Sequence, residues 1–197
     1  MDAIALLKKD HREVEQLFKK FQAAGERAGK QKLKLVQQMI AELSKHAVIE
    51  ESLFYPACRA ALKEIDDEDQ VLESLEEHHV VKWLLSELDG MKPSEERFDA
   101  KVSVLIENVK HHVKEEEREL FPKVKRLLAK EHLQALGVAM AELKKSAPTK
   151  PHPRSPDQPP GNLFTTPIAA ITDRATDLVK GAMRRRRGRE PVEHTTH

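Results

Sequence analysis

Apolar residues recur every three or four positions along the first three quarters of the chain, which is the period of an amphipathic helix. Four long segments follow this pattern, and glycine or proline separates most of them. We expect helices over about 2–24, 30–61, 66–89 and 94–125, with Ser94 as the N-cap of the fourth. A shorter pattern over about 130–145 predicts a fifth helix that packs on the outside or the end of the others.

The short connections between these segments favour antiparallel neighbours. The predicted fold class is therefore all-α, an antiparallel up-down four-helix bundle with a short fifth helix and a disordered C-terminal tail. Pro56 and Pro122 fall late in the second and fourth helices, and each should kink or end its helix. We assign residues 1–146 to the bundle and 147–197 to a Pro-rich linker and a basic, partly helical tail.

The tail changes character twice. Residues 146–162 read SAPTKPHPRSPDQPPGN, which is typical of an extended, disordered linker. Residues 166–183 then carry an apolar stripe, and four arginines follow at 184–187. Such a segment, here 166–189, suits an anionic membrane surface or an acidic protein partner. The alternative is a weakly structured tail whose arginines only add solubility.

Composition excludes several classes of protein. The chain has 197 residues and a net charge of +1, so it has no general attraction for nucleic acid and we expect no specific nucleic-acid partner. Its single cysteine, Cys58, rules out an intramolecular disulfide. No signal peptide and no membrane-spanning run is evident, so we expect a cytoplasmic protein. There is no Gly-rich phosphate loop and no Ser/His/Asp or Cys/His arrangement that would indicate an enzyme.

One motif occurs twice. Residues 46–56 read HAVIEESLFYP and residues 112–122 read HVKEEERELFP, so both copies follow H-x-x-x-E-E-x-x-x-aromatic-Pro. A histidine and a glutamate four residues apart lie one turn apart on the same face of a helix. Two such pairs on facing helices would form a mixed nitrogen and oxygen cage for metal ions.

The candidate metal ligands lie on the apolar stripes of all four long helices. They are His11, His46, Glu50, His78, His112 and Glu116. A single buried histidine is usually an ordinary core residue, but cores reject unpaired carboxylates, so the six together predict a metal site. Imidazole and carboxylate without cysteine suit iron, manganese or zinc. Six donors exceed what one zinc ion needs, so we expect two iron ions, bridged by carboxylates and a solvent oxygen.

Several neighbouring residues leave alternatives open. His111 lies beside His112 but off the apolar stripe, so we choose His112. Glu15 and His79 remain possible additional ligands. Glu51 and Glu117 are expected to face outward or to orient the ligands. The only tyrosine, Tyr55, either caps the site or packs as an ordinary aromatic residue, and we favour packing.

These motifs resemble a known family. The matching stretches are D-H-x-x-V from Asp10, H-x-x-x-E-E from His46, E-E-H from Glu76 and H-H-V-K-E-E-E-R-E-L-F-P from His111. Over about residues 1–145 the chain resembles hemerythrin-like, or HHE cation-binding, domains. The resemblance implies an antiparallel bundle around a non-haem di-iron centre, with the six residues above as ligands and Glu50 and Glu116 as bridging carboxylates.

The chain departs from the oxygen-carrying members of this family at Lys82, where the carriers have a further histidine. A lysine ammonium cannot bind a metal at neutral pH. We therefore expect a non-haem di-iron protein that reacts with or senses a small diatomic or peroxide ligand: oxygen, peroxide or nitric oxide. The alternatives are a protein that handles or donates iron, a reversible oxygen carrier, or an enzyme that consumes peroxide or nitric oxide.

Overall fold

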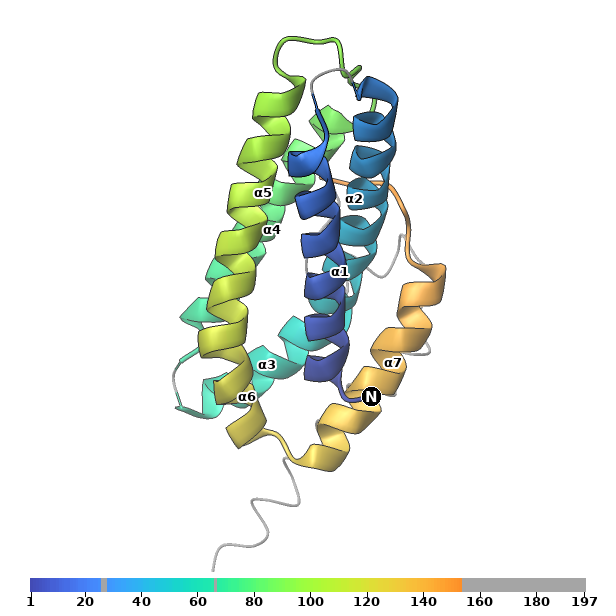
Figure 1. The fold of residues 1–197 in the computed structure, drawn as a ribbon. Helices are drawn as coiled ribbons and strands as arrows, with labels where there is room; N and C mark the ends of the chain where they lie inside the picture. The colour runs from blue at the N-terminus through green and yellow to red at the C-terminus, as the bar shows by residue number, and fades with distance from the viewer. Residues whose placement is uncertain (26–27, 66, 154–197) are drawn as a thin grey trace, which may run out of the picture.

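The computed structural model describes residues 1–25, 28–65 and 67–153, and within them it is all-helical. Four long helices form the bundle and run alternately up and down (Figure 1). They are α1 (Ala3–Ala23), α2 (Gly29–Ile49), α4 (Asp69–Leu88) and α5 (Phe98–Glu115). The predicted fold class of the bundle is thereby confirmed.

The ends of the helices follow local chemistry that the sequence shows only in part. The side chain of Asp2 accepts a hydrogen bond from the backbone N–H of Ala5 and caps α1. The predicted cap at Ser94 is wrong, because α5 begins only at Phe98. Glu95 instead accepts a hydrogen bond from the backbone N–H of Lys92, which holds residues 92–97 as turns before the buried ring of Phe98 starts the helix.

The repeated motif produces the same irregularity twice. A π-helical turn, η1 (Glu50–Phe54), joins α2 to α3 (Tyr55–Leu62), and a second, η3 (Glu116–Leu120), joins α5 to α6 (Phe121–Leu127). In each turn the backbone N–H of the motif's aromatic residue bonds to the carbonyl of the first glutamate, five residues back.

The motif prolines follow directly on these widened turns. Pro56 and Pro122 are the second residues of α3 and α6 and lie in the first helical turn, where a missing N–H is tolerated. The predicted break therefore takes the form of a π-turn just ahead of each proline, and the chain remains helical through both. Such turns are frequent at functional sites.

Two hydrophobic cores fill the bundle, one at each end. The first gathers the start of α1, the π-turns and the short helices, and contains Leu7, Leu53 and Leu75. The second gathers the opposite halves of the long helices, and contains Val14, Leu43 and Val81 among others. Between these cores lies a layer of buried polar residues, and that layer contains all six candidate ligands.

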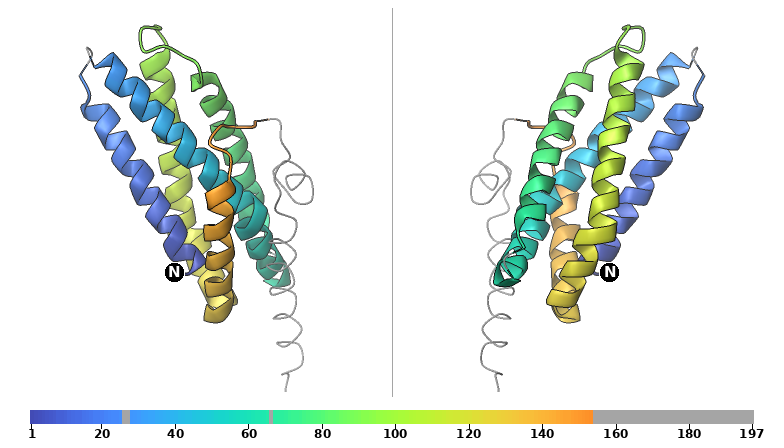
Figure 2. Two further views of the ribbon diagram at one scale, coloured as in Figure 1. Left: turned by 90° about the vertical axis from the view of Figure 1, so that its right-hand side faces the viewer. Right: turned by 90° about the vertical axis from the view of Figure 1, so that its left-hand side faces the viewer.

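The fifth helix, α7 (Lys130–Ser146), packs against α1 and α2, which confirms the predicted position outside the bundle (Figure 2). It approaches the N-terminus closely, since a Cβ atom added to Gly137 would lie 2.6 Å from the backbone of Asp2. No helix in the described part of the chain is long and apolar enough to cross a membrane. The predicted helix at 166–183 and the arginines at 184–187 lie outside the described residues.

Candidate metal centre

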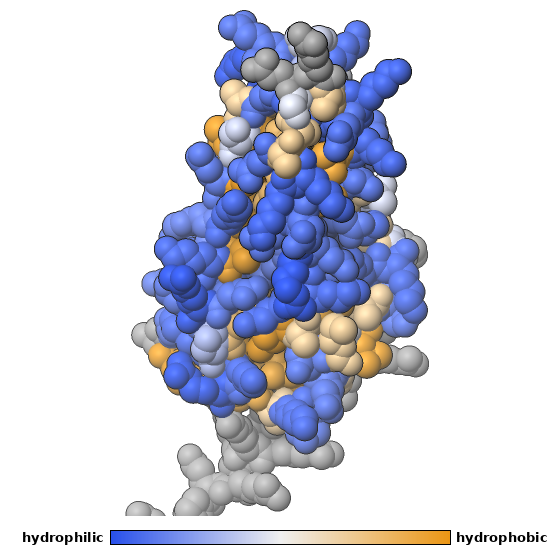
Figure 3. Space-filling view, viewed as in Figure 1, coloured by the Kyte–Doolittle hydropathy of each residue, from blue (hydrophilic) through white to orange (hydrophobic). Residues whose placement is uncertain are grey.

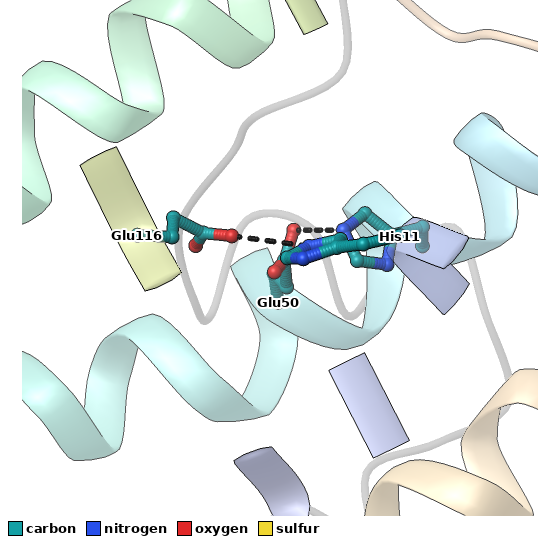
Figure 4. Close-up of side chains that lie close together, drawn as sticks. His11, Glu50 and Glu116 are labelled. Carbon is teal, nitrogen blue, oxygen red and sulfur yellow. Dashed lines mark ion pairs between the residues drawn. The ribbon is translucent and has the colours of Figure 1, made fainter. Parts of the chain in front are cut away.

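The structure brings all six candidate ligands together in the middle of the bundle. Each is buried, with 6% or less of its surface exposed. The four histidines come one from each long helix, and Glu50 and Glu116 come from the two π-turns. Figure 4 shows the carboxylate of Glu116 joined by an ion pair to the ring of His11, with the carboxylate of Glu50 close beside that ring. Residues separated by more than 100 positions in sequence thus share one small volume.

The donor atoms form two neighbouring groups in which all atoms lie within 4.8 Å of one another. One group contains His11, His46, Glu50 and Glu116, and the other contains Glu50, His78 and His112. Glu50 belongs to both. A carboxylate that belongs to two adjacent groups of donors is typical of a dinuclear site.

Each of the two glutamates lies between two histidines. The Oε2 atom of Glu50 is 3.1 Å from Nε2 of His46 and 3.2 Å from Nε2 of His78. The Oε2 atom of Glu116 is 3.3 Å from Nε2 of His11 and 3.6 Å from Nε2 of His112. Each glutamate therefore faces one histidine from its own half of the bundle and one from the other half.

The polar atoms at the centre are suited to binding a metal ion, because they are not used in hydrogen bonds within the protein. Nε2 of His11, Nε2 of His46, both carboxylate oxygens of Glu50 and Oε2 of Glu116 are buried without a hydrogen-bond partner. Buried polar atoms of this kind are rare in proteins because each costs free energy unless something satisfies it. Nitrogen and oxygen atoms that converge on one point, and that lack a hydrogen-bond partner in the protein, fit a bound cation.

In each of the four candidate histidines, the Nδ1 atom faces a carboxylate. Three of these contacts are short: Nδ1 of His11 lies 2.9 Å from Glu117, Nδ1 of His78 lies 3.0 Å from Glu51, and Nδ1 of His112 lies 2.7 Å from Glu77. The fourth is looser, with Nδ1 of His46 at 3.5 Å from Asp10. A carboxylate at Nδ1 fixes the ring and leaves Nε2 to face the centre, as in many metal sites.

Sequence reasoning assigned an orienting role, as one of two options, to only two of these four carboxylates. Glu51 and Glu117 follow the two central glutamates, whereas Asp10 and Glu77 directly precede the histidines of α1 and α4. The signal was present, because an acidic residue adjoins each of four candidate ligands. The periodicity could not reveal which histidine each carboxylate would reach, since every pair joins different helices.

Two lysines, the buried Lys82 and the half-buried Lys144, complete this outer layer. Lys82 donates to both oxygens of Glu51, at 2.9 and 3.0 Å, and so stands behind His78 rather than in the centre. Lys144 of α7 lies 2.7 Å from Asp10, which stands behind His46. Each lysine compensates the charge of a buried carboxylate that would otherwise be costly.

The charges at the centre depend strongly on one another. Burial alone would lower the pKa of His46, but the charge of Glu50 and the contact with Asp10 outweigh it and raise the pKa to about 10. Burial likewise lowers the pKa of His78, but the contacts of this ring with the carboxylates of Glu50 and Glu51 outweigh burial and raise the pKa to about 9. For Glu50 the burial effect is outweighed by His46, so its pKa is held well below the usual value.

Tyr55 occupies a more central place than aromatic packing requires. Its hydroxyl donates to Glu116 at 3.0 Å and lies 3.1 Å from Nε2 of His78 and 3.3 Å from Nε2 of His112. Burial and the charges of Glu116 and Glu50 raise its pKa well above the usual value. The phenol oxygen thus adds a potential donor to the group that has only three protein ligands.

The remaining candidates lie elsewhere. His111 is exposed and contacts Glu77 and Glu115 at the surface, whereas its neighbour His112 is buried. His79 is also exposed. Glu15 pairs with Lys19 at 2.9 Å and faces a surface groove, so it does not contribute to the centre.

A small cavity adjoins the centre on the side of the second hydrophobic core. Its volume is about 20 Å³. Apolar side chains form most of its wall, among them Val14, Leu43, Val81, Leu85 and Val109, and the four histidines form the rest together with Asp10 and Lys82. This space is sufficient for a ligand of about the size of one water molecule.

Comparison with known proteins agrees with this geometry. Residues 2–124 match the family described as the hemerythrin HHE cation-binding domain. An uncharacterised hemerythrin-like protein of Schizosaccharomyces pombe is 28% identical over 169 residues, covering 84% of this chain and 82% of that protein. The crystal structure of a hemerythrin HHE cation-binding domain-containing protein from Mycobacterium kansasii is similar, with a TM-score of 0.63 and 27% identity. That match covers 74% of this chain and 86% of the other.

A further relative is a DNA nickase of Nostoc, which is 30% identical over 127 residues. This match covers 64% of the present chain but only 34% of the nickase. The match therefore indicates a shared domain and does not extend to the rest of the nickase.

Proposed function

The chain belongs to the hemerythrin HHE cation-binding family, and from this premise we propose that it binds two iron ions and reacts with or senses a small oxidant. The observation that carries the proposal is the pair of adjacent donor groups that share Glu50, with donor atoms left unsatisfied by the protein. The choice of iron rests on the mixture of imidazole and carboxylate donors. Oxygen, hydrogen peroxide and nitric oxide are the proposed oxidants.

Three sets of residues have different roles in this proposal. The four histidines and two glutamates would hold the ions, and the ions would supply the electrons and an open position for the oxidant. The carboxylates of Glu117, Glu51, Glu77 and Asp10 keep the histidine rings in place. The apolar wall of the cavity limits the ligand to a small one and keeps bulk water away from the centre.

Lys82 favours a reactive or sensing role over reversible oxygen transport. Both oxygens of Glu51 bind the ammonium group of Lys82, so this group is not available as a metal ligand. A site that lacks this further imidazole either has an open position or contains a higher share of anionic oxygen donors, and anionic donors stabilise ferric iron. Both conditions favour irreversible oxidation.

The test is to purify the protein under low oxygen, determine its metal content, and record optical spectra while adding each oxidant. We expect about two irons per chain, from the two donor groups, and a lasting spectral change with at least one oxidant. One zinc per chain, unaffected by the iron supply during expression, would refute the proposal.

Three alternatives predict different results. A reversible carrier would recover its reduced spectrum fully when oxygen is removed, over repeated cycles. A protein that donates iron would lose it readily to a metal-free acceptor, and its oxidised form would be a storage state. Continuous turnover of peroxide or nitric oxide would indicate an enzyme.

A further inference from the structure

A groove on the surface between α1 and α5 lies directly above one side of the centre. It encloses about 630 Å³ and is lined by residues of α1, α5 and η3. Figure 1 shows these two helices side by side at the front of the molecule. In the same view the surface over them is mainly hydrophilic, with patches of hydrophobic atoms between (Figure 3).

The floor of the groove is also the wall of the inner cavity. His11, Val14, Val109 and Val113 line both spaces. His11 connects them directly, since its Nδ1 atom contacts Glu117 in the groove and its Nε2 atom contacts Glu116 at the centre. A path from the surface to the candidate metal ligands would therefore pass between the side chains of these three valines.

The rim of the groove is strongly cationic. Arg12 on α1 and Lys110, Lys114 and Arg118 along α5 and η3 line it, and all four are exposed. None of the four forms an ion pair with another described residue. The two acidic residues of the groove are already engaged, because Glu15 pairs with Lys19, and Glu117 contacts His11 and Lys8.

Four cations whose charge is not compensated locally create a positive potential that a cleft with an apolar floor concentrates. Such a potential raises the local concentration of anions and speeds their arrival. A neutral ligand such as oxygen or nitric oxide gains nothing from it. The arrangement is thus selective among small molecules by charge.

We propose that the α1/α5 groove is the access route to the centre and that its four cations admit small anions that bind metal. This inference rests on the proposed function, since it requires the proposed metal ions, and it adds a second class of ligand, small metal-binding anions, to the neutral oxidants proposed above. A macromolecular anion does not suit the site as well, because the floor leads only to a cavity of about 20 Å³.

The charge is tested with Arg12→Gln, Lys110→Gln, Lys114→Gln and Arg118→Gln combined in one protein. The control combines four exposed lysines on other elements, Lys34→Gln, Lys63→Gln, Lys92→Gln and Lys130→Gln, and so removes the same charge elsewhere. Stopped-flow spectra of the oxidised, metal-loaded proteins give the rate at which azide binds. Nitric oxide added to the reduced proteins serves as the neutral probe.

We expect the groove variant to bind azide about tenfold more slowly at low ionic strength and to lose most of the salt dependence of this rate. The control should stay near the wild type, and nitric oxide should bind all three proteins at the same rate. A groove variant that keeps the rate and salt dependence of the wild type would overturn the charge selectivity.

The route is tested separately by Val113→Phe, which places a larger ring at the half-buried boundary between groove and cavity. Both azide and nitric oxide should then bind several-fold more slowly, and an unchanged rate for both would overturn the route. Crystals soaked in bromide give a readout that needs no metal. Anomalous signal in the groove of the wild type but not of the four-cation variant supports the proposal, and no signal in the wild type contradicts it.

These measurements separate this inference from the proposed function. Absence of iron and of any azide-dependent spectrum would refute the metal proposal, while the bromide experiment would still report on the groove. Normal iron content with an azide rate that ignores the four cations would refute only the present inference.

Discussion

At the scale of single residues, the two ends of each imidazole ring have different partners. Nε2 faces the centre, and Nδ1 faces a carboxylate from another helix. This division is what a metal-binding histidine requires, because one nitrogen must be free of a proton while the other is held as a donor. The adjacent residues His111 and His112 differ in this respect. His112 has one ring nitrogen at the centre and the other against a carboxylate, whereas the ring of His111 is exposed.

Replacing these two neighbours one at a time tests the proposed ligands. His112→Ala should remove much of the bound iron, because its side chain lies in one of the two donor groups. His111→Ala should retain the iron, since that ring is exposed and contacts Glu77 and Glu115, which lie outside the two donor groups. Metal analysis of both proteins, purified in parallel, decides the matter. Equal loss from the two substitutions would mean that surface residues contribute as much as buried ones.

Tyr55→Phe isolates the contribution of one hydroxyl group. The ring keeps its packing, but Glu116 loses a hydrogen-bond donor in a fully buried site. We expect the metal-free protein to lose about 1–3 kcal/mol in its free energy of unfolding. Metal affinity should also fall, because the group of Glu50, His78 and His112 has only three other donors.

Denaturant unfolding and metal titration of Tyr55→Phe give these two quantities. Phe54→Leu is the matched control, since Phe54 is equally buried and packs against Phe121. It should destabilise the fold without changing metal affinity. If Tyr55→Phe binds metal as tightly as the wild type, the hydroxyl serves only the packing and hydrogen bonding of the metal-free protein.

Single residues also mark the limit of what the sequence could predict. The buried position of all six candidates followed from the apolar stripes, because the helical period places them on inward faces. The central hydroxyl of Tyr55 did not follow, since it depends on how the π-turn directs the ring. The partners of the Nδ1 atoms depend on contacts between helices, which a pattern within one helix does not contain.

At the scale of elements, the two π-turns are what the helical period did not specify, whereas it did predict α7. A π-turn changes the direction of the following residues by widening one turn, and the period of 3.6 gives no sign of it. Only Pro56 and Pro122 indicated in the sequence that the helices would be irregular at these places. The end of α4 followed from Gly90, whose φ of 118° suits glycine, but the start of α5 depended on the carboxylate of Glu95 and was misassigned.

Helix α7 lies beyond the residues that match the family, yet it reaches toward the centre. Lys144 contacts Asp10, and Asp10 faces His46. Lys144→Met should remove one of the two cations that face the buried carboxylate of Asp10 and lower the free energy of unfolding by about 1–3 kcal/mol. Because Asp10 would then hold His46 less firmly, metal affinity should fall as well.

Lys145→Met is the neighbouring control for this prediction. Its exposed ammonium pairs with Glu142 on the same helix, and such pairs contribute little to stability. Thermal unfolding with and without metal measures both effects. A Lys144→Met protein with wild-type stability and wild-type metal affinity would show that α7 only covers the bundle and does not support the centre.

At the scale of the whole molecule, the two halves of the chain contribute equivalent parts to one centre. Asp10 supports the histidine of α2, and Glu77 supports that of α5, so each of these contacts stays within one half. Glu51 and Glu117 each support a histidine of the other half. The centre is therefore complete only when both halves are folded together, and metal binding should stabilise the bundle as one unit.

The same concentration of acidic groups makes metal compete with protons. In the metal-free protein the pKa values of His46 and His78 are raised from 6.5 to about 10 and about 9. Their contribution to the stability of the metal-free fold is thus fully present below pH 6.5 and is lost as the pH rises through 9 and 10. A metal ion needs both imidazoles neutral, so at pH 8 its binding must displace protons.

We therefore expect roughly two protons to be released at pH 8 when manganese(II), which accepts the same donors, binds to the metal-free protein. Calorimetric titration in buffers of different ionisation enthalpy measures this number. The release should diminish as the pH approaches 10, and metal affinity should rise over the same range. His111→Ala should release as many protons as the wild type. Binding without proton release at pH 8 would show that the central carboxylates do not hold protons on these histidines.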